Sequence, residues 1–118
     1  MKILITGGAG FIGVNCAAYF SQRGEEVILF DNLSRQGGQQ NASWLAEKYP
    51  CRLVMGDIRN LNELAQLFRQ EGPFDLILHM AAQVGVTTSV INPREDFEIN
   101  AWGTFNLLEA VRLFNPRA

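Results

Sequence analysis

The chain has 118 residues with a formal net charge of −2, and 47% of the residues are hydrophobic while 19% are charged. This composition gives enough apolar chain for one buried core and too little net charge for disorder, and no apolar run approaches the roughly 20 residues of a membrane span. Twelve acidic against ten basic residues argue against a nucleic-acid partner, and two cysteines are too few for a disulfide scaffold. Because no apolar leader stands at the N-terminus, the expected compartment is the cytoplasm.

Four short runs rich in Ile, Leu and Val predict strands that are buried on both faces, as in a parallel sheet. They cover residues 2–6, 26–30, 51–55 and 75–79. Stretches with helical spacing of apolar residues alternate with them, at residues 10–23, 41–49, 61–70 and 92–114. The second of these predicts only one or two turns, and residues 35–40 before it read as a loop-like insert. The alternation predicts right-handed crossovers and a doubly wound α/β fold.

The segment from Thr6 to Gly13 joins the first predicted strand directly to the first predicted helix. Its glycines Gly7, Gly10 and Gly13 leave the backbone bare, so a diphosphate can approach the free N–H groups of the helix's first turn. The helix dipole also favours an anion there. Turn geometry alone would explain glycines, but their position between a strand and a helix predicts a dinucleotide-binding turn.

An acidic residue, Asp31, stands at the end of the second predicted strand, 18 residues after Gly13. In this position a carboxylate accepts hydrogen bonds from the hydroxyls of an adenosine ribose; the alternative is an Asp that caps a helix without any ligand. Its charge would repel a 2′-phosphate and therefore favours NAD over NADP. Arg35 weakens that preference, because a guanidinium in this position fits contact with a 2′-phosphate. The alternatives for Arg35 are a solvated loop charge and contact with the adenine face.

Two further strand ends carry candidate contacts. Asp57 and Ile58 follow the third strand, where an Asp accepts from an adenine amino group and Ile packs on the ring; the alternative is an Asp that starts the next helix. Small residues Ala81 and Ala82 follow the fourth strand and would leave room for the cofactor. The single histidine, His79, lies in an apolar strand and is interpreted as a core residue with satisfied ring nitrogens.

Residues 87–89, Thr-Thr-Ser, fit either a polar ligand contact or a plain loop. Asn100 lies within the last predicted helix, where Asn is a poor helix former. A polar contact on the cofactor side would explain it, and simple exposure is the alternative. Cys16 and Cys51 lack a C-x-x-C pattern and are expected to be buried thiols.

Five segments together resemble one family. They are TGGAGFIG at 6–13, DNLS at 31–34, GDIRN at 56–60, HMAAQV at 79–84 and NPREDFEINAWGTFNLLEAVR at 92–112. Through them the chain resembles the NAD-dependent epimerase/dehydratase family, the extended short-chain dehydrogenases that act on nucleotide sugars. Within this family the chain is most similar to the CDP-paratose 2-epimerases, while UDP-glucose 4-epimerases share DNLS and the spacing from Asn92 to Asn100.

This resemblance implies a Rossmann fold with strand order 3-2-1-4, NAD as cofactor and a nucleotide-sugar substrate in the full-length parent protein. Family members move a hydride from a sugar carbon to NAD and return it to the other face. The implied cofactor contacts are Gly7, Gly10, Phe11 and Ile12 at the pyrophosphate, Asp31, Asn32, Ser34 and Arg35 around the adenosine ribose, Asp57 and Ile58 at the adenine, Ala81, Ala82 and Gln83 on the nicotinamide side, and Asn100 near the cofactor.

The family's catalytic Tyr-x-x-x-Lys pair is absent, since Tyr19 and Tyr49 are followed four residues later by Arg23 and Leu53. Without such a pair, nothing obvious takes the proton of a sugar hydroxyl. Residues 1–118 are therefore interpreted as the N-terminal portion of an NAD-binding Rossmann domain, truncated after four strands, without the substrate domain and inactive alone. A fragment of a UDP-sugar 4-epimerase or nucleotide-sugar dehydratase, and a non-enzymatic nucleotide-sensing module, are the alternatives.

The expected strand order has a consequence for association. The fourth strand would lie unprotected at one edge of the sheet, where another strand can pair. The last helix would also expose apolar side chains such as Trp102 and Phe105. Both features predict self-association.

Overall fold

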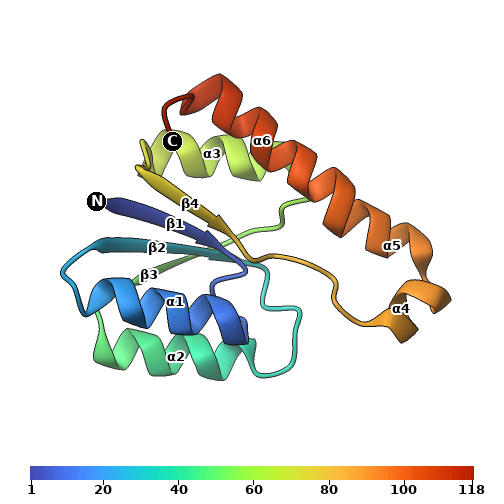
Figure 1. Ribbon diagram of the computed structural model, residues 1–118, viewed down its shortest axis with the longest axis horizontal. Coiled ribbons are helices and arrows are strands. Elements are labelled where there is room, and N and C mark those ends of the chain that lie inside the picture. The colour runs from blue at the N-terminus through green and yellow to red at the C-terminus, as the bar shows by residue number, and fades with distance from the viewer.

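The computed structural model describes all 118 residues as one four-stranded parallel sheet with helices on both faces (Figure 1). The strands are β1 (Lys2–Thr6), β2 (Glu26–Asp31), β3 (Arg52–Met55) and β4 (Leu76–His79). The helices are α1 (Phe11–Ser21), α2 (Gly38–Lys48), α3 (Leu61–Glu71), α4 (Val86–Ile91), α5 (Pro93–Phe97), the π-helical turn η1 (Glu98–Trp102) and α6 (Gly103–Phe114). The strand order is β3-β2-β1-β4, which confirms the doubly wound α/β fold and the order 3-2-1-4.

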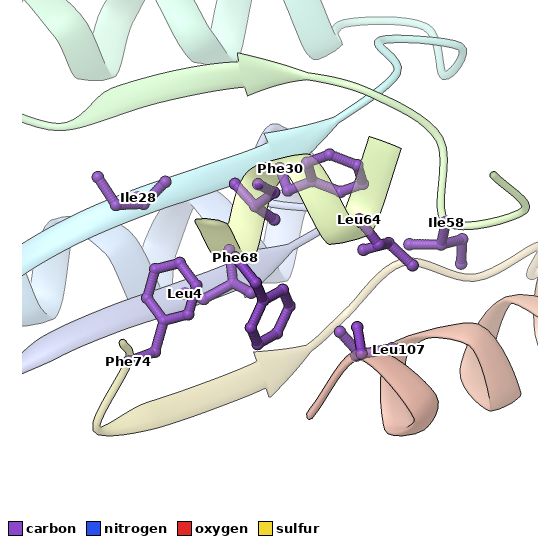
Figure 2. Packing of buried hydrophobic residues seen from close by; sticks show 10 residues of the cluster. Leu4, Ile28, Phe30, Ile58, Leu64, Phe68, Phe74 and Leu107 are labelled. Carbon is purple, nitrogen blue, oxygen red and sulfur yellow. The ribbon is translucent and has the colours of Figure 1, made fainter. Parts of the chain in front are cut away.

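Alternate residues of the central strands face opposite layers, because successive side chains of a strand point to opposite faces. Leu4, Ile28 and Phe30 belong to one core cluster with α3 and α6, and Figure 2 shows part of this cluster. Ile3, Ile5, Val27 and Leu29 belong to the second cluster, with side chains of α1 and α2. The central strands β1 and β2 are thus buried on both faces, as their continuous apolar sequences predicted, whereas the outer strands β3 and β4 are only partly buried because each pairs on one side.

Two observed helices differ from the prediction, one in its start and one in its existence. The helix α2 begins at Gly38 and spans 11 residues, so residues 38–40 of the predicted loop are helical. The helix α4 was not predicted, because its sequence VTTSVI is rich in β-branched residues and buries none of its side chains. Neither segment has the apolar spacing that marks an amphipathic helix in a sequence.

The last helix runs without a break from Pro93 to Phe114, close to the predicted range, but its middle forms the π-turn η1. Asn92 caps its start by accepting a hydrogen bond from the backbone N–H of Glu95 at 3.2 Å, as the Asn-Pro pair predicted. At its end, the Asn115 side chain accepts from the backbone N–H of Phe74 at 2.5 Å. The first contact caps the helix locally, whereas the second ties its C-terminal end to the segment before β4.

The outer strand β4 pairs only with β1, so its other edge has no partner strand. Along the last helix, Trp102 and Phe105 are 48% and 53% exposed, and their rings stack with centroids 5.6 Å apart. The predicted exposure of these two side chains is therefore confirmed. None of the helices combines the length and apolar character that crossing a lipid bilayer demands.

Candidate functional site

A cleft of about 410 Å³ lies where the carboxyl ends of the strands meet the helices, and we call it the strand-end cleft. Its walls come from the loops that follow all four strands. Twelve of the fourteen predicted contact residues line it: Gly7, Gly10, Phe11, Ile12, Asp31, Asn32, Ser34, Arg35, Asp57, Ile58, Ala81 and Ala82. Gln83 and Asn100 are not among the lining residues. Other lining residues were not predicted, and they include Gln36, Asn41, Met80, Val84 and Ile99.

The segment Thr6–Gly13, which we call the glycine turn, forms the floor of the cleft. Gly7 has a φ of +66°, and a Cβ built on it would lie only 2.6 Å from the backbone nitrogen of Ala81. A Cβ on Gly13 would lie 2.3 Å from the carbonyl oxygen of Gly7. Only glycine fits these two positions, because the first has a left-handed backbone and both meet other backbone atoms.

The first turn of α1 faces the cleft with free donors. Gly10 is the N-cap of this helix, and the backbone N–H groups of Phe11 and Ile12 have no hydrogen-bond partner. The Phe11 and Ile12 side chains are 81% and 60% exposed. Free N–H groups at the positive end of a helix, next to a bare backbone, are the arrangement that binds a diphosphate.

Asp31 connects the end of β2 to the glycine turn. One carboxylate oxygen accepts from the backbone N–H of Ala9 at 3.0 Å, and the other accepts from the backbone N–H of Leu33 at 2.7 Å. The residue therefore fixes two loops and caps no helix. Each carboxylate oxygen has a further lone pair with which it can accept from a ligand hydroxyl.

The Asp57 carboxylate lies in a network of its own. Arg59 donates to both of its oxygens, from Nε at 3.0 Å and from a terminal nitrogen at 2.7 Å, and the Arg59 backbone N–H and the Asn32 amide donate to it as well. The bound Arg59 guanidinium lowers the pKa of Asp57 to about 2, so the carboxylate is ionised at neutral pH. With four donors already bound, a hydrogen bond from an adenine amino group would have to replace one of them.

The loop after β2 presents two further polar side chains. The Asn32 side-chain oxygen accepts from the backbone N–H of Ser34 at 3.0 Å, which folds the loop into an Asx-turn. Arg35 lines the cleft next to Ser34, and its guanidinium forms no hydrogen bond or ion pair within the chain. It is therefore free to contact a ligand.

The loop after β4 is held from behind by the last helix. The Asn100 side chain accepts from the backbone N–H of Gln83 at 2.7 Å and donates to the Gln83 carbonyl at 2.9 Å. Its amide also donates to Asp96 at 3.1 Å, and Asp96 accepts from the Ser89 hydroxyl at 2.6 Å. Asn100 thus positions the wall of the cleft. Of residues 87–89, Ser89 is the one whose side chain forms hydrogen bonds, and its partners lie within the chain.

His79 has both ring nitrogens satisfied, as predicted, whereas the predicted burial of the two cysteines is only partial. The two ring nitrogens of His79 form hydrogen bonds with the hydroxyls of Thr6 and Thr104. Burial lowers the pKa of the imidazole. Cys16 and Cys51 are free thiols, although both are only partly buried. Burial raises the pKa of Cys51, so this thiol is not an activated nucleophile.

Residues 4–118 match the GDP-mannose 4,6 dehydratase family. The chain is 50% identical over 115 residues to the CDP-paratose 2-epimerase of Salmonella typhi, covering 98% of this chain and 34% of that protein. The UDP-glucose 4-epimerase of Thermus thermophilus in complex with NAD has a TM-score of 0.84 and 38% identity, covering 97% of this chain and 34% of that one.

A second solved structure, the UDP-glucose-4-epimerase of Stenotrophomonas maltophila with bound NAD and formylated UDP-arabinopyranose, has a TM-score of 0.86 and 30% identity. The match covers 95% of this chain and 33% of that one. The chain therefore spans about one third of the length of these relatives. The family match over residues 4–118 and these relatives together show that the chain belongs to the NAD-dependent epimerases and dehydratases, in the GDP-mannose 4,6-dehydratase family.

Proposed function

We propose that residues 1–118 form the N-terminal portion of the NAD-binding Rossmann domain of a nucleotide-sugar epimerase of the CDP-paratose 2-epimerase type. The observation that carries this proposal is the glycine turn, where Gly7 has no room for a side chain and the N–H groups of Phe11 and Ile12 are free. Backbone donors of this kind match the charge and the size of a diphosphate. The 50% identity to a CDP-paratose 2-epimerase supports the choice of parent enzyme.

The cleft offers partners for each part of the dinucleotide. The pyrophosphate would lie on the glycine turn, and the adenosine ribose would donate to Asp31, next to Asn32, Ser34 and Arg35. The adenine would pack on Ile58, and its amino group would contact Asp57.

On the nicotinamide side, Ala81 and Ala82 line the cleft, and Asn100 acts behind them by positioning Gln83. NAD, when bound in this family, supplies an acceptor and donor of hydride.

The negative charge of Asp31 at the ribose position supports a preference for NAD over NADP. A 2′-phosphate placed there would meet a carboxylate whose two oxygens are already fixed by Ala9 and Leu33 and cannot turn away without breaking those bonds. Arg35 offsets part of this repulsion, since its guanidinium is free. We therefore infer a preference of moderate size, in favour of NAD.

We also propose that residues 1–118 alone do not turn over a nucleotide sugar. The sequence contains no Tyr-x-x-x-Lys, and its two lysines, Lys2 and Lys48, follow neither tyrosine at that distance. A general base for the sugar hydroxyl is therefore missing from these residues. We expect the full-length parent protein to bind the nucleotide sugar. The two free thiols support a cytoplasmic location, because disulfides are rare in that compartment.

Self-association is the remaining part of the proposal. The free edge of β4 and the exposed stack of Trp102 and Phe105 support it, because unpaired strand edges and contiguous apolar surface both favour contact between copies.

Calorimetric titration of the 118-residue chain with NAD and with NADP tests the cofactor assignment. We expect NAD to bind more tightly than NADP. The substitution Asp31→Ala should weaken the binding of NAD and reduce the difference in affinity between NAD and NADP. Glu47→Ala, which removes an exposed carboxylate of α2 that forms no hydrogen bond, is the matched control and should bind like the parent chain. A chain that remains folded and shows no heat with millimolar NAD would contradict the proposed function.

A further inference from the structure

A continuous line of hydrogen bonds connects the cleft wall to the last helix through the only histidine. The backbone N–H of Ala81 donates to the Thr6 hydroxyl at 3.3 Å, and that hydroxyl lies 2.6 Å from His79 Nδ1. His79 Nε2 lies 3.0 Å from the Thr104 hydroxyl, which donates to the Asn100 carbonyl at 2.5 Å. The line therefore crosses from β1 through β4 to α6 and ends in the π-turn η1.

The direction of each bond in this line follows from counting protons. The Asn100 carbonyl has no proton, so the single proton of the Thr104 hydroxyl is used there. His79 Nε2 must then donate to Thr104 Oγ1, and in a neutral imidazole this leaves Nδ1 as an acceptor. The Thr6 hydroxyl donates to Nδ1 and is left to accept from the Ala81 N–H, which is the bond observed.

We propose that His79 is a positioning residue, a neutral imidazole with its proton on Nε2, which holds Ala81 against the glycine turn through the Thr6 hydroxyl. The proposal rests on the proposed function in one respect, namely that the wall held in place is a wall of an NAD site. Burial of the ring favours the neutral imidazole, because it lowers the pKa of His79.

The position of Ala81 matters because its backbone packs closely against Gly7. The Ala81 nitrogen lies so close to Gly7 that even a Cβ on that glycine would approach it to 2.6 Å. From the other end of the loop, Asn100 holds the Gln83 backbone with two hydrogen bonds. Residues 100 and 104 of the last helix thus fix both ends of segment 81–83, one directly and one through His79 and Thr6.

The tautomer is testable without any ligand, because the chain has a single histidine. In the 118-residue chain labelled with ¹⁵N at histidine, two-dimensional NMR at neutral pH should give one histidine with a protonated Nε2 and an unprotonated Nδ1. A protonated Nδ1, either alone or together with a protonated Nε2, would overturn the proposal.

Thr104→Val tests whether the effect reaches Ala81, which is three hydrogen bonds away. Removing the hydroxyl leaves Nε2–H without its acceptor, so we expect a mixture of tautomers, faster hydrogen exchange at the Ala81 amide and NAD binding weakened about threefold to tenfold. Thr104→Ser keeps the hydroxyl and should restore all three. A purely local role of Thr104 would leave the tautomer and the Ala81 amide unchanged, and this result would refute the proposal.

The two proposals fail in different ways. If the parent chain does not bind NAD, the proposed function is wrong, while the tautomer and the Ala81 amide still decide the role of His79. If NAD binds and Thr104→Val changes neither the tautomer nor the Ala81 exchange rate, the proposed function stands and the positioning role of His79 is rejected.

Discussion

The Asp31 carboxylate accepts a hydrogen bond from the backbone N–H of Ala9 at 3.0 Å and so anchors the glycine turn to the end of β2. Its other oxygen accepts from the Leu33 N–H at 2.7 Å. The acid proposed to bind the ribose therefore also organises the floor of the cleft before any ligand arrives. A substitution at this position acts on the stability of the free protein as well as on binding.

Asp31→Asn separates these two effects, because the amide keeps the size of the carboxylate and has one acceptor oxygen in place of two. Either the Ala9 or the Leu33 N–H loses its partner, and we expect the free energy of unfolding to fall by about 1–2 kcal/mol. Urea denaturation without nucleotide measures this change. The exposed Glu47→Gln on α2 is the control, and equal losses in the two variants would mean that the anchor contributes nothing.

Gly7→Ala should be far more damaging than the same change at Gly24. Both glycines have a positive φ, +66° and +80°, but nothing lies within 4 Å of a Cβ on Gly24 while Ala81 blocks a Cβ on Gly7. We expect Gly24→Ala to cost about 1 kcal/mol of stability from backbone strain alone and to leave NAD binding unchanged. Gly7→Ala should cost more and weaken NAD binding at least tenfold, measured by denaturation and calorimetry; equal effects would contradict the close approach.

The pH dependence of stability should show the Asp57 network. The pKa of Asp57 is about 2 in the folded chain against an ordinary value of 3.8, so this carboxylate stabilises the fold above pH 4. That contribution is lost as the pH falls from about 4 to 2, because the unfolded chain takes up the proton first.

Asp57→Asn is the control for this loss. Urea denaturation at several acidic pH values should give a flatter profile for the variant than for the parent chain. His79, whose pKa burial lowers from 6.5, adds a separate loss that begins below about pH 6.5 and persists in the variant. Identical slopes for the two chains between pH 4 and 2 would rule out the assignment to Asp57.

Phe105→Glu should reduce self-association. Phe105 is exposed and stacks on Trp102, so a charge there would break the apolar surface of the last helix. Tyr19→Glu places the same charge on an aromatic of similar exposure on α1, at the opposite face of the sheet, and should leave association unchanged. Sedimentation velocity over a range of concentrations distinguishes them, and a parent chain that stays monomeric at high concentration would argue against association altogether.

Much of the fold follows from local sequence. The strands are short and apolar on both faces, so β1 was predicted to the residue and the others to within one residue at either end. The glycine turn was equally visible, because Gly7 and Gly13 have spacing and position that few other structures require. Among the predicted residues that line the cleft, Asp31, Asp57, Ile58, Ala81 and Ala82 were predicted from their positions at strand ends, whereas Phe11, Ile12, Asn32 and Ser34 were implied by the family resemblance.

The sequence did not reveal which polar groups pair with one another or where the helical geometry changes. Arg59 is two residues from Asp57, yet nothing in their spacing says that the guanidinium binds the carboxylate predicted for adenine. Asn100 was expected near the cofactor, and the sequence did not indicate that its amide also holds the Gln83 backbone, 17 residues away. No pattern in the amino-acid sequence predicts the π-turn in the last helix, which is seen only in the structure.

The strand order β3-β2-β1-β4 explains why a cleft exists at all. The chain leaves β1 into α1 on one face of the sheet, whereas it leaves β4 toward α6, which packs with α3 on the other face (Figure 1). The loops that follow these two neighbouring strands therefore depart in opposite directions and leave an opening between them, the topological switch point of an open parallel sheet. The opening comes from the path of the backbone, so changes of individual side chains can retune what enters it without closing it.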